Sequence, residues 1–115
     1  MFGLFQVIDG PDGGRKFTLR DGQTLRIGRG PETDTQLQDP AVSRLHCEVN
    51  MIVNKALLKD AGSAAGTWVN GERVTECKLM PGDVIRMGNT KLTFLWSTLD
   101  ESQTMPETKV KNLTG

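Results

Sequence analysis

The sequence predicts an all-β protein, an antiparallel sandwich or barrel built from many short strands. Three observations support this fold class. Short runs alternate apolar and polar residues, turn-forming residues separate these runs, and no window of about 11 or more residues repeats its apolar positions every 3.6 residues. The 13 glycines and five prolines in the 115-residue chain would also interrupt long helices.

Runs with strand composition occur along most of the chain. They are residues 4–8, 16–19, 24–28, 46–53, 56–60, 67–69, 83–87 and 91–96. The alternation is clearest at Leu92, Phe94 and Trp96, as a strand with one buried face requires. Pairs such as Asp21-Gly22 and Asn70-Gly71 supply turns between the runs, because Gly and Asn tolerate positive φ.

The charge balance argues against nucleic acid as a partner. Fourteen Lys and Arg residues offset 14 Asp and Glu residues, so the formal net charge is zero. Proteins that bind nucleic acid usually carry a basic surplus to neutralise phosphates. No run of about 18 apolar residues predicts a membrane span, and the N-terminus lacks the features of a signal peptide. We therefore expect a cytoplasmic protein, or the cytosolic part of a larger one.

The two cysteines are predicted to be reduced thiols. Cys47 and Cys77 stand far apart, without a second pair or a C-x-x-C motif. The chain shows no pattern of metal ligands and no nucleotide-binding loop. The sequence therefore predicts neither a metal site nor a cofactor.

The organisation indicates one domain followed by a tail. Residues 1–97 carry the strand pattern, whereas residues 98–115 lose apolar character and are predicted to be a flexible tail or linker. Within the domain, residues 30–42 and 61–66 lack any strand signal. Long loops on a rigid sheet scaffold are where binding residues tend to lie.

Three segments at strand–loop junctions predict a binding site for a phosphate group. They begin at Ile27, Ser43 and Asp60, and the loops of a sandwich gather at its ends, so the segments can meet in space. Arg29 and Arg44 would supply guanidinium groups, Ser43 a hydroxyl, and the glycine-rich third segment free backbone N–H groups. No acid–base pair able to act on the phosphate accompanies them. The pattern therefore predicts binding without catalysis, in a protein that is not an enzyme.

Four motifs occur in order along these segments and just after them. They are G-R, S-R-x-H, G-S-x-x-G-T-x-V-N-G and L-x-x-G-D-x-I-x-x-G, beginning at Gly28, Ser43, Gly62 and Leu79. With these motifs, over residues 4–96, the sequence resembles the forkhead-associated (FHA) domain family. The resemblance implies a β-sandwich of about eleven short strands whose loops at one end bind phosphothreonine peptides. The implied partner is a phosphothreonine-containing protein, a substrate of a Ser/Thr kinase in a signalling pathway.

The resemblance also implies a role for each residue of the site. Arg29 and the hydroxyl of Ser43 would contact the phosphate, and Arg44, at a variable position, can reach it. Residues implied to support the site from within are Gly28, His46, Gly66, Thr67 and Asn70.

Position 65 departs from the family pattern. Family members commonly have Asn immediately before the Gly-Thr pair, and this Asn hydrogen-bonds the peptide backbone beside the phosphothreonine. Here the residue is Ala65, which follows Ala64. Losing one such bond costs about 0.5–1.5 kcal/mol, or up to roughly tenfold in affinity. We expect weaker or less selective peptide binding, unless Ser63 substitutes. The alternative is a phospho-independent scaffold or interaction domain that keeps the fold and has lost recognition.

A further alternative is a hydrolase in which Ser43 and His46 act with Asp39 or Asp60. The local sequence argues against it, because there is no G-x-S-x-G elbow to expose the serine. Residues three apart at the start of a strand also point to opposite faces. We expect His46 to be structural.

The tail contains three threonines close to acidic residues, Thr98, Thr104 and Thr108. One of them, once phosphorylated, would be a tethered ligand for the domain's own site or for that of a neighbour. Tethering raises the local concentration, so that even weak binding becomes significant.

Overall fold

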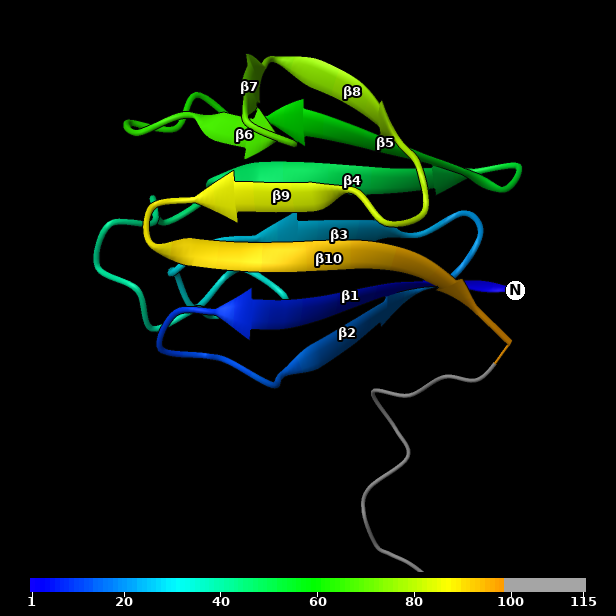
Figure 1. Ribbon diagram of the computed structural model, residues 1–115, viewed down its shortest axis with the longest axis horizontal. Helices are drawn as coiled ribbons and strands as arrows, with labels where there is room; N and C mark the ends of the chain where they lie inside the picture. The colour runs from blue at the N-terminus through cyan, green and yellow to red at the C-terminus, as the bar shows by residue number, and fades with distance from the viewer. Residues whose placement is uncertain (99–115) are drawn as a thin grey trace, which may run out of the picture.

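The computed structural model describes residues 1–98 and forms a two-sheet antiparallel sandwich (Figure 1). Its strands are β1 (Phe2–Asp9), β2 (Lys16–Leu19), β3 (Thr24–Ile27), β4 (Cys47–Ile52), β5 (Lys55–Asp60), β6 (Thr67–Val69), β7 (Glu72–Val74), β8 (Glu76–Leu79), β9 (Val84–Met87) and β10 (Thr90–Ser97). No helix able to cross a membrane occurs in this part of the chain. The prediction of an all-β sandwich is confirmed, with ten strands where the family resemblance implied about eleven. Most of the predicted tail, residues 99–115, lies outside the described residues.

The two sheets contain six and four strands. The larger has the order β2-β1-β10-β9-β6-β7 and the smaller the order β3-β4-β5-β8. Alternate residues of each strand face the space between the sheets, as the period of two predicted. Phe5 and Phe94, opposite each other on β1 and β10, are both fully buried, with ring centroids 5.2 Å apart. Trp96 packs edge-on against Phe94 at the rim of this core.

Two strands, β7 and β8, were not predicted from the sequence. Both lie within the segment Glu-Arg-Val-Thr-Glu-Cys-Lys-Leu, whose charged residues mask the apolar pattern. Each strand is at the edge of its sheet, where charged side chains face solvent and protect the open edge. Cys77 on β8 and Cys47 on β4 are free thiols that contact the core. Burial, and then the nearby charge of Asp60, raises the pKa of the Cys47 thiol, so this cysteine stays protonated.

The long connection between β3 and β4 is fixed by buried polar side chains. The hydroxyl of Thr35 accepts a hydrogen bond from Gly28 N and donates one to Gly28 O, both at 3.1 Å. The carboxylate of Asp12, from the β1–β2 loop, accepts a hydrogen bond from Gln38 N at 2.7 Å. These bonds satisfy backbone groups that no strand ladder pairs, and they hold the loop in one conformation.

Asp39 joins the same loop to the β9–β10 hairpin. Its carboxylate is 1% exposed and accepts hydrogen bonds from Ala41 N (2.9 Å), Asn89 N (2.8 Å) and the hydroxyl of Thr90 (2.9 Å). Burial alone would raise the pKa of this carboxyl, but the hydrogen bonds outweigh burial and lower the pKa below its usual value. The ionised form of Asp39 is therefore the one that the folded state favours.

Replacing Asp39 by Asn should destabilise the domain by about 1–3 kcal/mol at neutral pH, because an NH₂ group replaces an oxygen that accepts two of these bonds. Since folding lowers the pKa of Asp39, the stabilisation is complete well above the unfolded-state value of about 3.9 and is lost as the pH falls below it. Urea unfolding of both proteins at about pH 7 and about pH 3 measures this. The difference between the two proteins should shrink at the lower pH; a constant difference would contradict the assignment.

Candidate functional site

Two of the predicted segments run alongside each other at the loop end of the sandwich. Arg29 N donates a hydrogen bond to Ser43 O at 3.1 Å, and Gly30 N donates one to Arg44 O at 2.9 Å. Gly28 is necessary for this approach, because a Cβ at this position would lie 2.1 Å from Arg44 O. The backbone thus brings the side chains of Arg29 and Ser43 to the same end of the molecule.

The guanidinium of Arg29 is exposed and held by the backbone. Its Nε donates a hydrogen bond to Val42 O at 2.9 Å. Within residues 1–98, no carboxylate oxygen lies within 4.0 Å of it. The acidic neighbours in sequence are engaged elsewhere: Glu32 pairs with Arg44 at 3.5 Å, and Asp34 accepts a bond from the backbone of β3. Arg29 therefore presents a positive charge that no described carboxylate neutralises.

Ser43 connects this region to the third segment. Its hydroxyl oxygen accepts a hydrogen bond from Ala64 N at 3.1 Å, which leaves the hydroxyl proton for another acceptor. Arg44 lies on the exposed side, where its ion pair with Glu32 is long and both side chains are more than half exposed. Such a pair contributes little stability, so an anion can compete for the guanidinium.

The imidazole of His46 is buried between the two loops. Nδ1 accepts a hydrogen bond from Ser43 N at 3.1 Å, and Nε2 lies 2.8 Å from Gly66 O. Because Nδ1 accepts, the ring proton is on Nε2 and is donated to Gly66 O. Both ring nitrogens are thus engaged by backbone groups, and the hydroxyl of Ser43 is bonded to the loop of Ala64 instead. The geometry needed for a Ser–His pair is not found in the described part of the chain.

The third loop, residues 61–66, is organised by Asp60. One carboxylate oxygen accepts from the hydroxyls of Ser63 (2.6 Å) and Thr67 (2.7 Å), and the other from the backbone N of Gly62 (3.0 Å) and Ser63 (3.1 Å). Burial would raise the pKa of Asp60, but these hydrogen bonds lower it below its usual value. From the sequence, Asp60 was considered as the first residue of the third segment and as a possible partner of Ser43 and His46, but not as the group that organises the loop. An Asp followed by Gly and Ser two and three positions later indicates a side-chain-capped turn, and that signal was missed.

The hydroxyl of Ser63 is used within the loop. It donates to Asp60 and accepts from Gly66 N at 3.0 Å. Gly66 has a φ of +87°, which a residue with a side chain rarely adopts. Ala64 and Ala65 are exposed, and Ala65 O accepts a 3.4 Å hydrogen bond from the indole Nε1 of Trp68.

Comparison with known proteins identifies the family. Residues 6–97 match the family described as "Inner membrane component of T3SS, cytoplasmic domain", which is an FHA-like domain. A solved structure described as "Structural and functional analysis of phosphothreonine-dependent FHA domain interactions" superposes with a TM-score of 0.78 and 38% identity, over 86% of this chain and all of that chain. The chain is a forkhead-associated domain.

Two curated relatives are longer than this FHA domain. It is 42% identical over 87 residues to the FHA domain-containing protein FhaA of Mycobacterium tuberculosis, covering 76% of this chain and 16% of FhaA. It is 39% identical over 92 residues to the glycogen accumulation regulator GarA of Mycolicibacterium smegmatis, covering 80% of this chain and 58% of GarA. The chain therefore matches only part of the length of each of these relatives.

The FHA fold gives Asn70 a supporting position. Asn70 has a φ of +52°, and its side chain donates to Asp83 Oδ1 at 2.8 Å and accepts from Val84 N at 2.9 Å. The Asn70-Gly71 turn is thereby tied to the loop before β9. Thr67 is fully buried beside Asp60, as described above.

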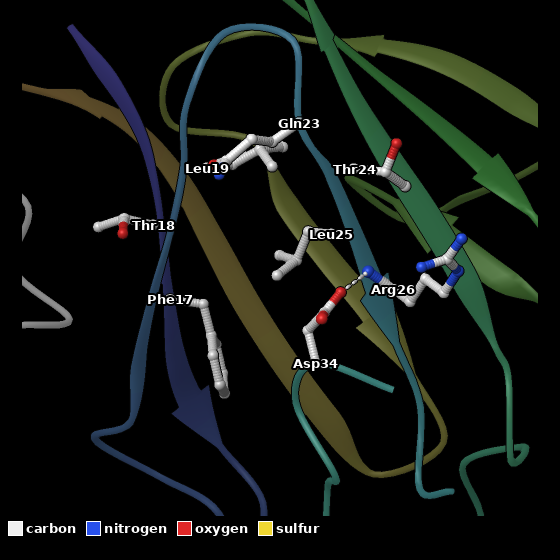
Figure 2. A pocket seen from close by; sticks show the side chains of 8 residues that line it. All are labelled: Phe17, Thr18, Leu19, Gln23, Thr24, Leu25, Arg26 and Asp34. Carbon is white, nitrogen blue, oxygen red and sulfur yellow. Dashed lines mark hydrogen bonds between the residues drawn. The ribbon is translucent and has the colours of Figure 1, made fainter. Parts of the chain in front are cut away.

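A separate groove of about 500 Å³ lies between β2 and β3, at the seam of the two sheets (Figure 2). Its lining residues are Phe17, Thr18, Leu19, Gln23, Thr24, Leu25, Arg26 and Asp34. Asp34 Oδ2 accepts a hydrogen bond from Arg26 N at 2.7 Å, and Asp34 N donates to Arg26 O at 2.9 Å, so the loop covers part of the β3 edge. None of the predicted site residues lines this groove.

Replacing His46 by Phe tests the link between the two loops. The ring volume is retained, but Ser43 N and Gly66 O each lose a partner, which should lower the free energy of unfolding by about 2–5 kcal/mol. Urea unfolding gives the loss, and amide hydrogen exchange at Ser43 should accelerate. Unchanged far-ultraviolet circular dichroism would show that the sheets persist. A loss below about 0.5 kcal/mol would show that the imidazole does not hold the loops.

Proposed function

We propose that this chain is a phosphothreonine-dependent interaction module. Arg29, Ser43 and Arg44 bind the phosphate. In the loop 61–66, the backbone N–H of Ala65 adds a donor, because those of the other five loop residues are already bonded within residues 1–98. The observation that carries this proposal is the exposed guanidinium of Arg29, without a carboxylate partner in residues 1–98, held against the segment that bears Ser43. The function includes no covalent step.

The selectivity for a phosphorylated partner is electrostatic. A phosphate group adds about −1.5 to −2 charges and three acceptor oxygens, and charge-assisted hydrogen bonds are about twice as strong as neutral ones. An unmodified threonine would leave Arg29 hydrated and would gain little. The contact lies at an exposed surface, so added salt weakens it.

The peptide backbone is held less firmly in this domain than the family pattern implies. Ala65 contributes no side-chain hydrogen bond, and its carbonyl already accepts the bond from Trp68. Ser63 was predicted to substitute for the missing asparagine. We propose instead that it only supports the loop, because its hydroxyl both donates and accepts hydrogen bonds within the loop. The domain therefore depends on charge for most of its affinity.

Replacing Arg29 by Ala should weaken binding of a phosphothreonine peptide by about 10- to 100-fold, because a charge-assisted contact of about 1.5–3 kcal/mol is lost. Calorimetric titration with phosphorylated and unphosphorylated forms of one peptide measures this. Arg26→Ala is the matched control, since it removes the same charge on β3, where Arg26 faces Glu48. Equal binding of the two peptide forms would instead favour the phospho-independent scaffold, and full binding by Arg29→Ala would show that the site is elsewhere.

We also propose that the chain's own threonines are ligands in cis or between copies. Thr98 is exposed at the end of the described residues, whereas Thr104 and Thr108 lie outside them. Incubation with a Ser/Thr kinase should phosphorylate at least one of the three, and the modified chain should then bind an external phosphopeptide about tenfold more weakly by self-competition. Mass spectrometry and peptide titration test this. The absence of phosphate on all three threonines would reject it.

A further inference from the structure

Four adjacent strands place three basic side chains and one tryptophan in a row on the outer face of the six-stranded sheet. Arg73 on β7 lies opposite Trp68 on β6, Trp68 opposite Arg86 on β9, and Arg86 opposite Lys91 on β10. Figure 1 shows β10, β9 and β6 following one another across the sheet. Directly opposed residues of antiparallel strands point to the same face. The next residue along each of two strands, Val69 and Leu92, is buried, so this basic row faces solvent.

No basic side chain of this row forms an ion pair with a carboxylate in residues 1–98. In residues 1–98, no carboxylate oxygen lies within 4.0 Å of Arg73, Arg86 or Lys91. Asp9 lies opposite Lys91 but beyond ion-pair distance, and it accepts a hydrogen bond from Gly10 N. The net charge of the whole chain is zero, so three unpaired cations in one row are a local surplus.

Trp68 provides a rigid surface within this row. The guanidinium of Arg86 lies over the indole ring, 4.9 Å from its centroid. This stacking fixes the plane of the guanidinium and leaves its edge N–H groups pointing away from the ring. An arginine held in this way presents a planar pair of donors of the kind that a carboxylate accepts.

The basic row is continuous with the recognition loop. A Cβ built on Gly66 would lie 2.6 Å from Arg73 Nε and 2.9 Å from its Cζ, so the guanidinium of Arg73 lies against the backbone of Gly66. The neighbouring residue of the row, Trp68, also contacts this loop: its indole Nε1 donates a hydrogen bond to Ala65 O at 3.4 Å. The row therefore begins beside position 65, where the family pattern places the asparagine that holds the peptide.

We propose that the basic row is a second subsite, which binds an acidic side chain of the peptide that flanks the phosphothreonine. Arg73 is the specificity-determining residue, and Arg86, oriented by Trp68, supports it. The carboxylate contact replaces the side-chain hydrogen bond that Ala65 lacks. This inference rests on the proposed phosphothreonine function, because the phosphate site brings the flanking residues to the row.

A set of phosphothreonine peptides with alanine flanks, each carrying a single Asp at one of the positions around the phosphothreonine, tests the subsite. For the unaltered domain, Asp at one or two neighbouring positions should tighten binding by roughly three- to tenfold, the range of a partly exposed charge pair. Arg73→Gln should remove this gain and leave the affinity for the all-alanine phosphopeptide within about twofold. Arg26→Gln, which removes a charge from the other sheet, should keep the gain.

The outcomes separate the subsite from the phosphate site. If the domain binds phosphopeptides but gains nothing from Asp at any position, or if Arg73→Gln keeps the gain, the subsite is rejected and the proposed function stands. If the domain binds no phosphopeptide at all, both proposals are rejected. Arg73→Lys, which keeps the charge and loses the planar pair of donors, should retain only part of the gain if the geometry of the arginine matters.

Discussion

The loop end of this domain depends on one buried imidazole. His46 accepts a hydrogen bond from Ser43 N and donates one to Gly66 O, and so links two loops whose bonded residues are 23 positions apart in the chain. A neutral imidazole carries an acceptor and a donor on opposite sides of a rigid ring, whereas an Asn or Gln amide carries both at the end of a flexible side chain. With the ring in place, the Ser43 hydroxyl also accepts a hydrogen bond from Ala64 N, so the groups of the proposed phosphate site are held by the same contacts.

Three buried or half-buried carboxylates hold the loops of this domain in place. Asp12, Asp39 and Asp60 each accept hydrogen bonds from loop backbone or hydroxyl groups, because the loops have no strand ladder to pair with. The acidic acceptors are thereby turned inward. Donors remain outside, above all the guanidinium of Arg29 and the hydroxyl proton of Ser43. Outward-facing donors of this kind favour an anion, which supports the proposed function.

Much of this arrangement could be predicted from the sequence, because it is encoded locally. The period of two in β10 and the turn residues between strands indicate the sandwich, and the segments that bear Arg29 and Ser43 meet as expected. Edge strands such as β7 were missed, because their charged side chains, which protect the open edge of the sheet, hide the alternation of apolar and polar residues. The neighbours of Arg73 could not be predicted either. They follow from the register of β6 between β7 and β9, and strand register depends on packing across the whole sheet.

Ala65 lies where the locally encoded loop meets the outer face of the six-stranded sheet. A side chain at this position would hold the peptide from within the loop, but alanine cannot, and the carbonyl of Ala65 is instead tied to Trp68 on the sheet. The loop therefore continues directly into the outer face, where Arg73 lies against Gly66. In the proposed function, the loops bind a phosphate and the sheet binds a carboxylate. Recognition then requires a peptide in which these two groups have the right spacing. A neutral backbone hydrogen bond has no such requirement, because every peptide offers it at every residue. If the proposed subsite binds as described, the alanine at position 65 leaves the selectivity of this domain to the charges that flank the phosphothreonine.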